Sequence, residues 1–172
     1  MKPTENMQDN YSLFDHMAAW FDRQGMKHEA CPEKNYIATC IPRNNGRWSL
    51  LIKIDEQHRQ TFFYSQLDMF APEDRQQAVM EYMTRANHGM RQGHFELDLA
   101  DGEMCFKIGI QFSELAPSDL QIGSLVNCVI GVTSQYFPGL MAAIYAGRSP
   151  KEAIESIEAS PSLDRPINQP LH

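Results

Sequence analysis

The sequence predicts an α+β protein of two layers, in which about five antiparallel strands form a sheet with helices packed on one face. Residues 95–112 alternate apolar and polar side chains on either side of Asp101-Gly102, a pattern typical of a β-hairpin. Three earlier strand-like runs have connections too short for crossover helices, which favours antiparallel pairing. Helical periodicity elsewhere supplies the second layer, and the predicted order is α-β-β-β-α-β-β-α-α.

The first predicted helix begins near Ser12, which suits the N-cap position and has Asp15 three residues later. Gly25 is a natural end for this helix, because glycine accepts the left-handed conformation common at helix C-termini. One face of the helix is apolar and carries Leu13, Phe14, Met17, Trp20 and Phe21.

Three strands are predicted next, over residues 36–41, 48–54 and 61–64. Pro42 closes the first, and the polar run 55–60 forms a hairpin loop between the second and third. The second helix opens at Pro72, since proline is tolerated at the first helical position, and it ends at residues 87–89.

The long hairpin of residues 95–112 follows the second helix. If Asp101-Gly102 forms a two-residue turn, counting outward places Leu99 opposite Met104 on an apolar face. The same count places Glu96 opposite Lys107 on a polar face, which can meet water.

The third helix begins near Ser118, and no charged residue occurs from position 120 to position 147. We expect Pro138 to kink or break it, because the proline ring removes a hydrogen bond and clashes one turn back. A last helix starts at Ser149, where Glu152 completes a capping box. Polar residues and Pro138 interrupt the uncharged stretch, so we predict no membrane span.

The 172 residues predict a single domain over residues 11–159, with a flexible N-terminus (1–10) and a disordered C-terminal tail (160–172). The net charge of −7 and the lack of a Lys/Arg cluster argue against nucleic acid as a partner. The four cysteines form no C-x-x-C pair and the start has no leader-like pattern, so we expect a cytoplasmic protein.

Sequence motifs for catalysis are absent: the chain contains no G-x-S-x-G, G-x-x-x-x-G-K-[ST], G-x-G-x-x-G or H-E-x-x-H. Two histidines and a thiol, His88, His94 and Cys105, would make a reasonable zinc shell. No fourth ligand with a defined spacing is visible, so solvated loop histidines are the favoured interpretation. We therefore predict no enzyme, no cofactor and no metal.

Two features indicate protein interaction. Methionines cluster around the second helix, and flexible thioethers suit adaptable surfaces; Met80, Met83 and Met90 are the candidates, with Met83 expected to face the core. The uncharged third helix carries a small-residue stripe at Gly123, Asn127 and Gly131. A helix uncharged all round is usually buried all round. Either the chain's own helices or a second subunit could bury it, and we favour a homodimer.

Several segments together resemble the YbjN-like domain family over residues 13–158. They are Pro72 with Arg75, Ala86-Asn87, the run Gly93-His94-Phe95-Glu96-Leu97-Asp98 leading through Gly102 to Met104-Cys105-Phe106-Lys107, Tyr136-Phe137-Pro138, and Ala146-Gly147-Arg148-Ser149-Pro150 before Glu152-Ala153-Ile154. The resemblance implies a bacterial protein with a fold similar to that of type III secretion chaperones, which are acidic homodimers that hold a partner polypeptide. It supplies no catalytic residue and implies a role in signal regulation or stress.

The function predicted from the sequence is a non-enzymatic protein-interaction domain. It would act as a chaperone-like or regulatory adaptor that binds an unidentified polypeptide through an apolar, Met-containing surface. The alternative is a small-molecule- or metal-binding domain with a pocket between the helix layer and the sheet.

Overall fold

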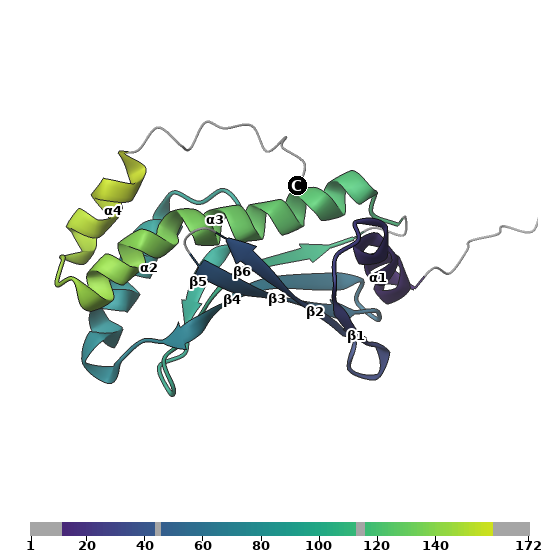
Figure 1. The fold of residues 1–172 in the computed structure, drawn as a ribbon, viewed down its shortest axis with the longest axis horizontal. Helices are drawn as coiled ribbons and strands as arrows, with labels where there is room; N and C mark the ends of the chain where they lie inside the picture. Colours follow the sequence, from purple (N-terminus) through teal and green to yellow (C-terminus); the bar gives the residue numbers. More distant parts are fainter. Residues whose placement is uncertain (1–11, 44–45, 113–115, 160–172) are drawn as a thin grey trace, which may run out of the picture.

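The computed structural model describes residues 12–43, 46–112 and 116–159 (Figure 1). Its elements are α1 (Leu13–Arg23), β1 (Glu29–Cys31), the 3₁₀ helix η1 (Pro32–Lys34), β2 (Tyr36–Arg43), β3 (Gly46–Asp55), β4 (Gln60–Phe70), the 3₁₀ helix η2 (Glu73–Arg75), α2 (Gln76–His88), β5 (His94–Leu97), β6 (Glu103–Gln111), α3 (Asp119–Tyr145) and α4 (Pro150–Glu158). The predicted flexible N-terminus and C-terminal tail lie outside the described residues.

The six strands form an antiparallel sheet in the order β1-β2-β3-β4-β6-β5. This confirms the predicted α+β class, with one strand more than expected. The additional strand β1 has three residues and pairs with β2 through Cys31 opposite Tyr36. Three residues are too few to show an alternation of apolar and polar side chains, so this strand could not be predicted from periodicity.

The predicted register of the β5–β6 hairpin is wrong by two residues. Leu97, rather than Leu99, lies opposite Met104. The Asp98 amide donates to the Glu103 carbonyl (2.9 Å) and the Gly102 amide donates to the Asp98 carbonyl (2.8 Å), so the loop is longer than two residues. Because side chains alternate with a period of two, this shift leaves every strand residue on its predicted face. It leaves Leu99 in the loop, with 58% of its surface exposed.

The apolar core lies between the sheet and the helices. The largest fully buried side chains come from α1, from α2 and from one face of strands β2, β3, β4 and β6: Trp48, Tyr82, Phe21, Phe63, Phe106, Leu13, Met17, Ile37, Leu50, Ile52, Met104 and Ile108. The helix α3 crosses the sheet above this core, with α1 near one end of it and α2 and α4 near the other (Figure 1). The sheet's opposite face carries no helix among the described residues.

Pro138 does not break α3, which continues from Asp119 to Tyr145. Pro138 itself is exposed, while Gly139 and Leu140 beside it are buried. Packing of the helix on both sides of the proline therefore outweighs the hydrogen bond that the ring removes. By length and composition α3 could cross a membrane, and 44% of its most apolar window is buried in this fold.

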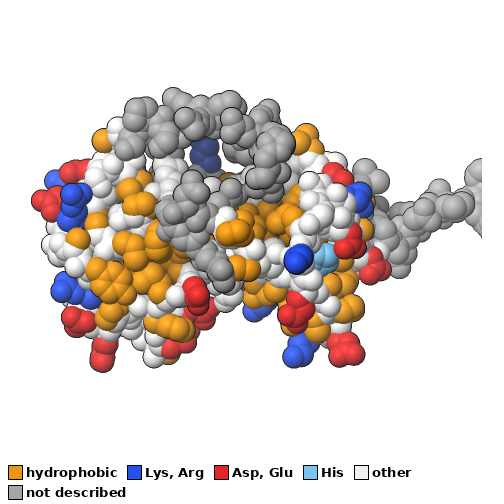
Figure 2. Space-filling model, viewed as in Figure 1, with side chains coloured by type: hydrophobic (Ala, Val, Ile, Leu, Met, Phe, Trp, Pro, Cys, Tyr) orange, Lys and Arg blue, Asp and Glu red, His pale blue; other side chains and the backbone are white. Residues whose placement is uncertain are grey.

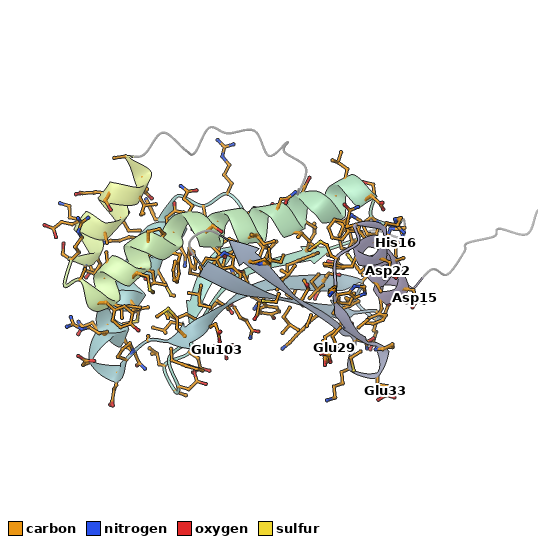
Figure 3. All side chains as sticks on the ribbon, in the orientation of Figure 1. Asp15, His16, Asp22, Glu29, Glu33 and Glu103 are labelled. Carbon is orange, nitrogen blue, oxygen red and sulfur yellow. The ribbon has the colours of Figure 1, made fainter. Side chains whose placement is uncertain are left out.

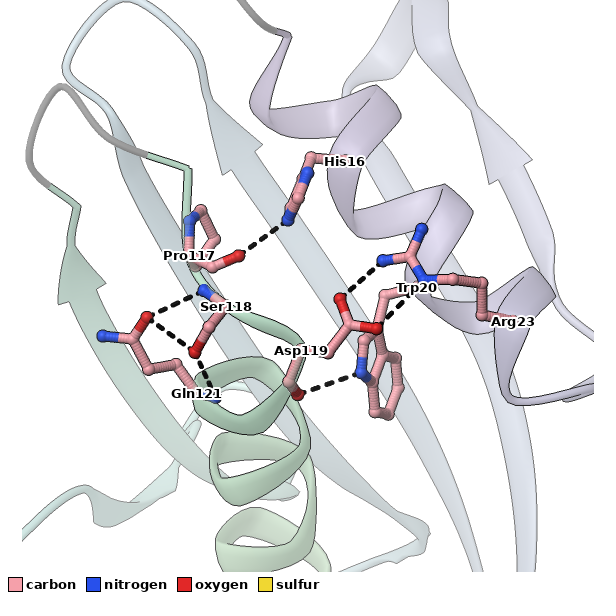
Figure 4. Close-up of polar contacts among 7 residues, drawn as sticks. All are labelled: His16, Trp20, Arg23, Pro117, Ser118, Asp119 and Gln121. Carbon is pink, nitrogen blue, oxygen red and sulfur yellow. Dashed lines mark hydrogen bonds and ion pairs between the residues drawn. The ribbon is translucent and has the colours of Figure 1, made fainter.

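Polar contacts fix the start of α3 against α1 (Figure 4). The Trp20 indole donates to the Asp119 carbonyl (3.1 Å), and the Arg23 guanidinium donates two hydrogen bonds to the Asp119 carboxylate (2.6 and 3.0 Å). The hydrogen bonds from Arg23 lower the pKa of Asp119. Ser118 and Gln121 form a capping box at the same place, so the first turn of α3 is held from two directions.

The turn between β3 and β4 holds the start of α1. The carboxylate of Glu56 accepts hydrogen bonds from the backbone amides of Leu13 (3.1 Å) and Phe14 (2.6 Å) and from the Ser12 hydroxyl (3.0 Å). Ser12 also caps the helix, as predicted, by accepting from the Asp15 amide. A carboxylate at a helix N-terminus is stabilised by the free amides and the helix dipole, so Glu56 joins α1 to the sheet.

Candidate protein-interaction surfaces

From Leu120 to Tyr145 the outer surface of α3 is uncharged. Leu120 is 76% exposed at one end and Tyr145 is 66% exposed at the other, and no charged residue lies between them in the sequence. Figure 2 shows hydrophobic side chains gathered over the C-terminal half of α3, with charged side chains around the rim of this face. A soluble helix normally turns charged side chains to water, so this surface is unusual for a helix that packs on only one side.

The three residues of the small-residue stripe have different surroundings. A Cβ atom added at Gly123 would lie 3.5 Å from the Trp20 ring, so this glycine lies close to α1. Asn127 is half-buried. Gly131 is exposed, and a Cβ atom there would have nothing within 4 Å. The N-terminal part of the stripe therefore serves packing within the chain, and Gly131 is the position open to another molecule.

The three candidate methionines also differ. Met83 is 3% exposed and belongs to the core, and Met90 is partly buried against it. Met80 lies on the outer side of α2 and is 46% exposed. Of the three, Met80 is therefore the most exposed to a partner.

The structure does not bring the proposed zinc ligands into one shell. His88 is exposed at the end of α2, whereas His94 on β5 contacts the Glu96 carboxylate (2.9 Å). Burial, together with the carboxylates of Glu96 and Glu103, raises the pKa of Cys105 to about 12, so its thiol stays protonated at neutral pH. Across residues 12–43, 46–112 and 116–159, no group of three His, Cys, Asp or Glu could hold a metal ion.

Side chains fill the space between the sheet and the part of the helix layer formed by α2 and the C-terminal half of α3. The gap that remains there is too small to hold a water molecule. Its lining includes Leu67, Tyr82, Phe95, Tyr136, Phe137 and Leu140. This part of the layer therefore has no room for a ligand, whereas a separate open depression of about 700 Å³ lies between the end of β6 and the start of α3.

The uncovered face of the sheet is less polar than the sequence predicted. The cross-strand neighbours Leu51 on β3 and Tyr64 on β4 are only half-buried. The ring of Phe62 lies over the backbone of Gly109, where an added Cβ would meet it at 3.0 Å. The signal for this surface was present in the sequence, because the run Thr61-Phe62-Phe63-Tyr64 places an aromatic ring on each side of the strand.

Charged groups lie among these rings. The ammonium of Lys107 is 5.5 Å from the ring centres of both Phe62 and Tyr64, and that of Lys53 is 5.4 Å from the Tyr64 ring. Lys107 also binds the Glu96 carboxylate (3.1 Å). Partial burial raises the pKa of Glu96, but hydrogen bonds from His94 and Lys107 outweigh it and the net shift is downward. The face is therefore an ordered mixture of aromatic, cationic and anionic groups.

Residues 14–141 match the YbjN family, whose description is "Putative bacterial sensory transduction regulator". The fold is similar to that in "Crystal structure of YbjN, a putative transcription regulator from E. coli", with a TM-score of 0.56 and 14% sequence identity. This similarity covers 80% of the present chain and 93% of the other. No curated protein matches the sequence. At 14% identity the structural match is evidence for the fold alone.

Proposed function

The chain belongs to the YbjN family, as its motifs indicated, and from that premise we propose that it is a non-enzymatic, cytoplasmic regulator that works as a homodimer and binds another protein. The family description places it among bacterial regulators of sensory transduction. The observation that carries the proposal is the uncharged outer surface of α3, which the chain's own described helices leave open at Gly131.

A second copy of α3 is the occupant that best fits this surface. At 1.5 Å per residue, the uncharged part of α3, from Leu120 to Tyr145, gives a strip about 39 Å long. A twofold dimer uses the same patch on both subunits, so an uncharged strip meets an uncharged strip and no charge is left without a partner. Glycine at position 131 lets two helices approach closely where they cross.

The dimer is tested by light scattering during size-exclusion chromatography. We expect the wild-type protein at about 50 µM to have twice the chain mass of 19.7 kDa, and Gly131→Arg to have the mass of one chain. Gly89→Arg is the matched control, because Gly89 is also exposed with nothing within 4 Å of an added Cβ. A wild-type monomer, or a Gly131→Arg dimer, would contradict the proposal.

A further inference from the structure

The face of the sheet opposite α3 has a depression at the end of β4, β5 and β6. Its volume is about 710 Å³, and its lining includes Leu51, Tyr64, Leu97, Leu99, Glu96 and Glu103. Figure 3 shows Glu103 on the side of the sheet that faces away from α3. An adjoining depression of about 790 Å³ shares Leu51 and Lys53 with it, so the concave surface continues across β3.

Two large apolar side chains are mostly exposed to solvent at this corner of the sheet. Leu99, in the β5–β6 loop, is 58% exposed, and Phe70, at the end of β4, is 60% exposed. Both are close to Glu103, since Phe70 is its partner across the strands and Leu99 lines the same depression. Exposed apolar side chains grouped beside a concavity mark a binding surface rather than a solvated one.

The charge of the depression is negative. Three carboxylates line it, those of Glu96, Asp98 and Glu103, against two ammonium groups, that of Lys53 in the lining and that of Lys107 beside Glu96 and Tyr64. Glu96 is paired with Lys107, but the nearest polar contact of the Glu103 carboxylate is the neutral Gln66 amide (2.7 Å). The whole chain has a net charge of −7, so its field also favours a cationic occupant.

We propose that this depression is the docking site for an extended segment of a partner protein that carries Lys or Arg beside large apolar side chains. The apolar side chains contact Leu99, Phe70 and Leu51, and the basic groups pair with Glu103 and Asp98. A segment of polypeptide, rather than a small molecule, fits two adjoining open depressions. The inference names the partner's chemistry for the proposed regulator, and so it rests on that function. The site lies on the opposite side of the sheet from α3, so dimerisation leaves it free.

Fluorescence anisotropy with two labelled peptides of about ten residues tests the site. One alternates Lys with Leu, and the other has Glu in place of every Lys. We expect the Lys peptide to bind the full-length protein at least about tenfold more tightly than the Glu peptide, with an affinity that falls as salt is added. Equal binding of the two peptides, or preference for the Glu peptide, overturns the proposal.

Variants of the protein locate the binding. Leu99→Ser combined with Phe70→Ser should weaken binding of the Lys peptide at least about tenfold, because apolar anchors carry most of the binding energy of such contacts. Glu103→Gln should weaken it about threefold, a typical effect of a rim charge, whereas Glu155→Gln on α4 should have no effect. Circular dichroism checks folding, which these exposed substitutions should leave intact.

Three results assign the surface differently and overturn the inference. Loss of binding in Met80→Ser, with the Leu99 and Phe70 variant unaffected, places the peptide on α2. If Glu155→Gln and Glu103→Gln weaken peptide binding equally, the Lys peptide is attracted by the net charge of the protein alone. If the Leu99 and Phe70 variant is a monomer while the wild-type protein is a dimer, this face is the dimer interface. A wild-type monomer that still prefers the Lys peptide contradicts the dimer and leaves the docking site standing.

Discussion

The two faces of the sheet use the same strands for different purposes. On the covered face, Trp48, Phe63 and Phe106 are at most 2% exposed, and the Trp48 ring packs against Phe137 of α3. On the uncovered face, the neighbours Leu51 and Tyr64 remain half-exposed beside lysines and carboxylates. Because successive side chains point to opposite faces, one strand supplies stability on one side and a contact surface on the other. Substitutions should therefore separate the two roles cleanly.

The largest effect is expected from truncating the covered face. Phe106→Ala removes a fully buried ring that packs edge-to-face against Phe95, with ring centres 5.0 Å apart. It should lower the free energy of unfolding by about 3–5 kcal/mol, since the lost burial and the cavity both cost stability. Leu99→Ala on the other side should change it by less than about 0.5 kcal/mol. Urea denaturation measures both, and a comparable loss in the two variants would remove the distinction between the faces.

The same comparison can be made on the two sides of α3. A Cβ atom at Gly139 would overlap the Tyr82 hydroxyl and lie 2.8 Å from Ile157 on α4. Gly139→Ala should therefore destabilise the fold by about 1–3 kcal/mol through overpacking. Gly131→Ala, eight residues earlier in the same helix, has open space and should stabilise the monomer fold by about 0.5–1 kcal/mol through helix propensity. Thermal unfolding at low protein concentration measures the change in melting temperature of each variant. Two shifts of the same sign would contradict the assignment of Gly139 to the packed side of α3 and Gly131 to its open side.

The parts of the fold that could be predicted are those that depend on local hydrogen bonding and alternation. Ser12 and Ser149 cap their helices as expected, because a serine hydroxyl and the amides two or three residues later are neighbours in sequence. Ser118, near which the third helix was expected to begin, caps α3 in the same way. The hairpin register was not predictable by counting from Asp101-Gly102. The backbone of Gly102 instead pairs with that of Ala71 (2.8 Å), a contact with a residue distant in sequence.

The candidate surfaces were harder to predict than the fold. The stripe through Gly123, Asn127 and Gly131 has regular spacing, but spacing alone does not reveal that α1 lies against its first member. The corner formed by Leu99 and Phe70 was missed because it depends on two irregular features, the β5–β6 loop and the register shift in β4 between Gln66 and Phe70. Side chains at such irregularities leave the period-two pattern on which sequence interpretation depends.

A smaller effect on stability is expected at the edge of the sheet formed by β5. The Asn87 side chain from α2 accepts from the Phe95 amide (2.7 Å) and donates to the Phe95 carbonyl (3.1 Å), taking the place of a neighbouring strand. Asn87→Ala leaves both backbone groups without these partners and should cost about 1–2 kcal/mol. Hydrogen exchange at the Phe95 amide should accelerate more than exchange at Phe106 on the adjacent strand. Unchanged protection of the Phe95 amide would show that the Asn87 side chain does not stabilise this edge of the sheet.

The smallest effect is expected on the uncovered face, as a change in pH dependence. The pKa of Glu96 lies below its ordinary value of 4.5, because hydrogen bonds from His94 and Lys107 outweigh partial burial. Its ionised form therefore stabilises the folded state above that ordinary value, and the contribution is lost as the pH falls through the lowered pKa. Glu96→Gln should lower the melting temperature slightly at pH 7 and reduce its fall between about pH 5 and pH 3. Glu155→Gln, at an exposed helix position, should leave the fall unchanged. If both variants follow the wild-type profile, the Glu96–Lys107 pair orders the uncovered face without stabilising the fold.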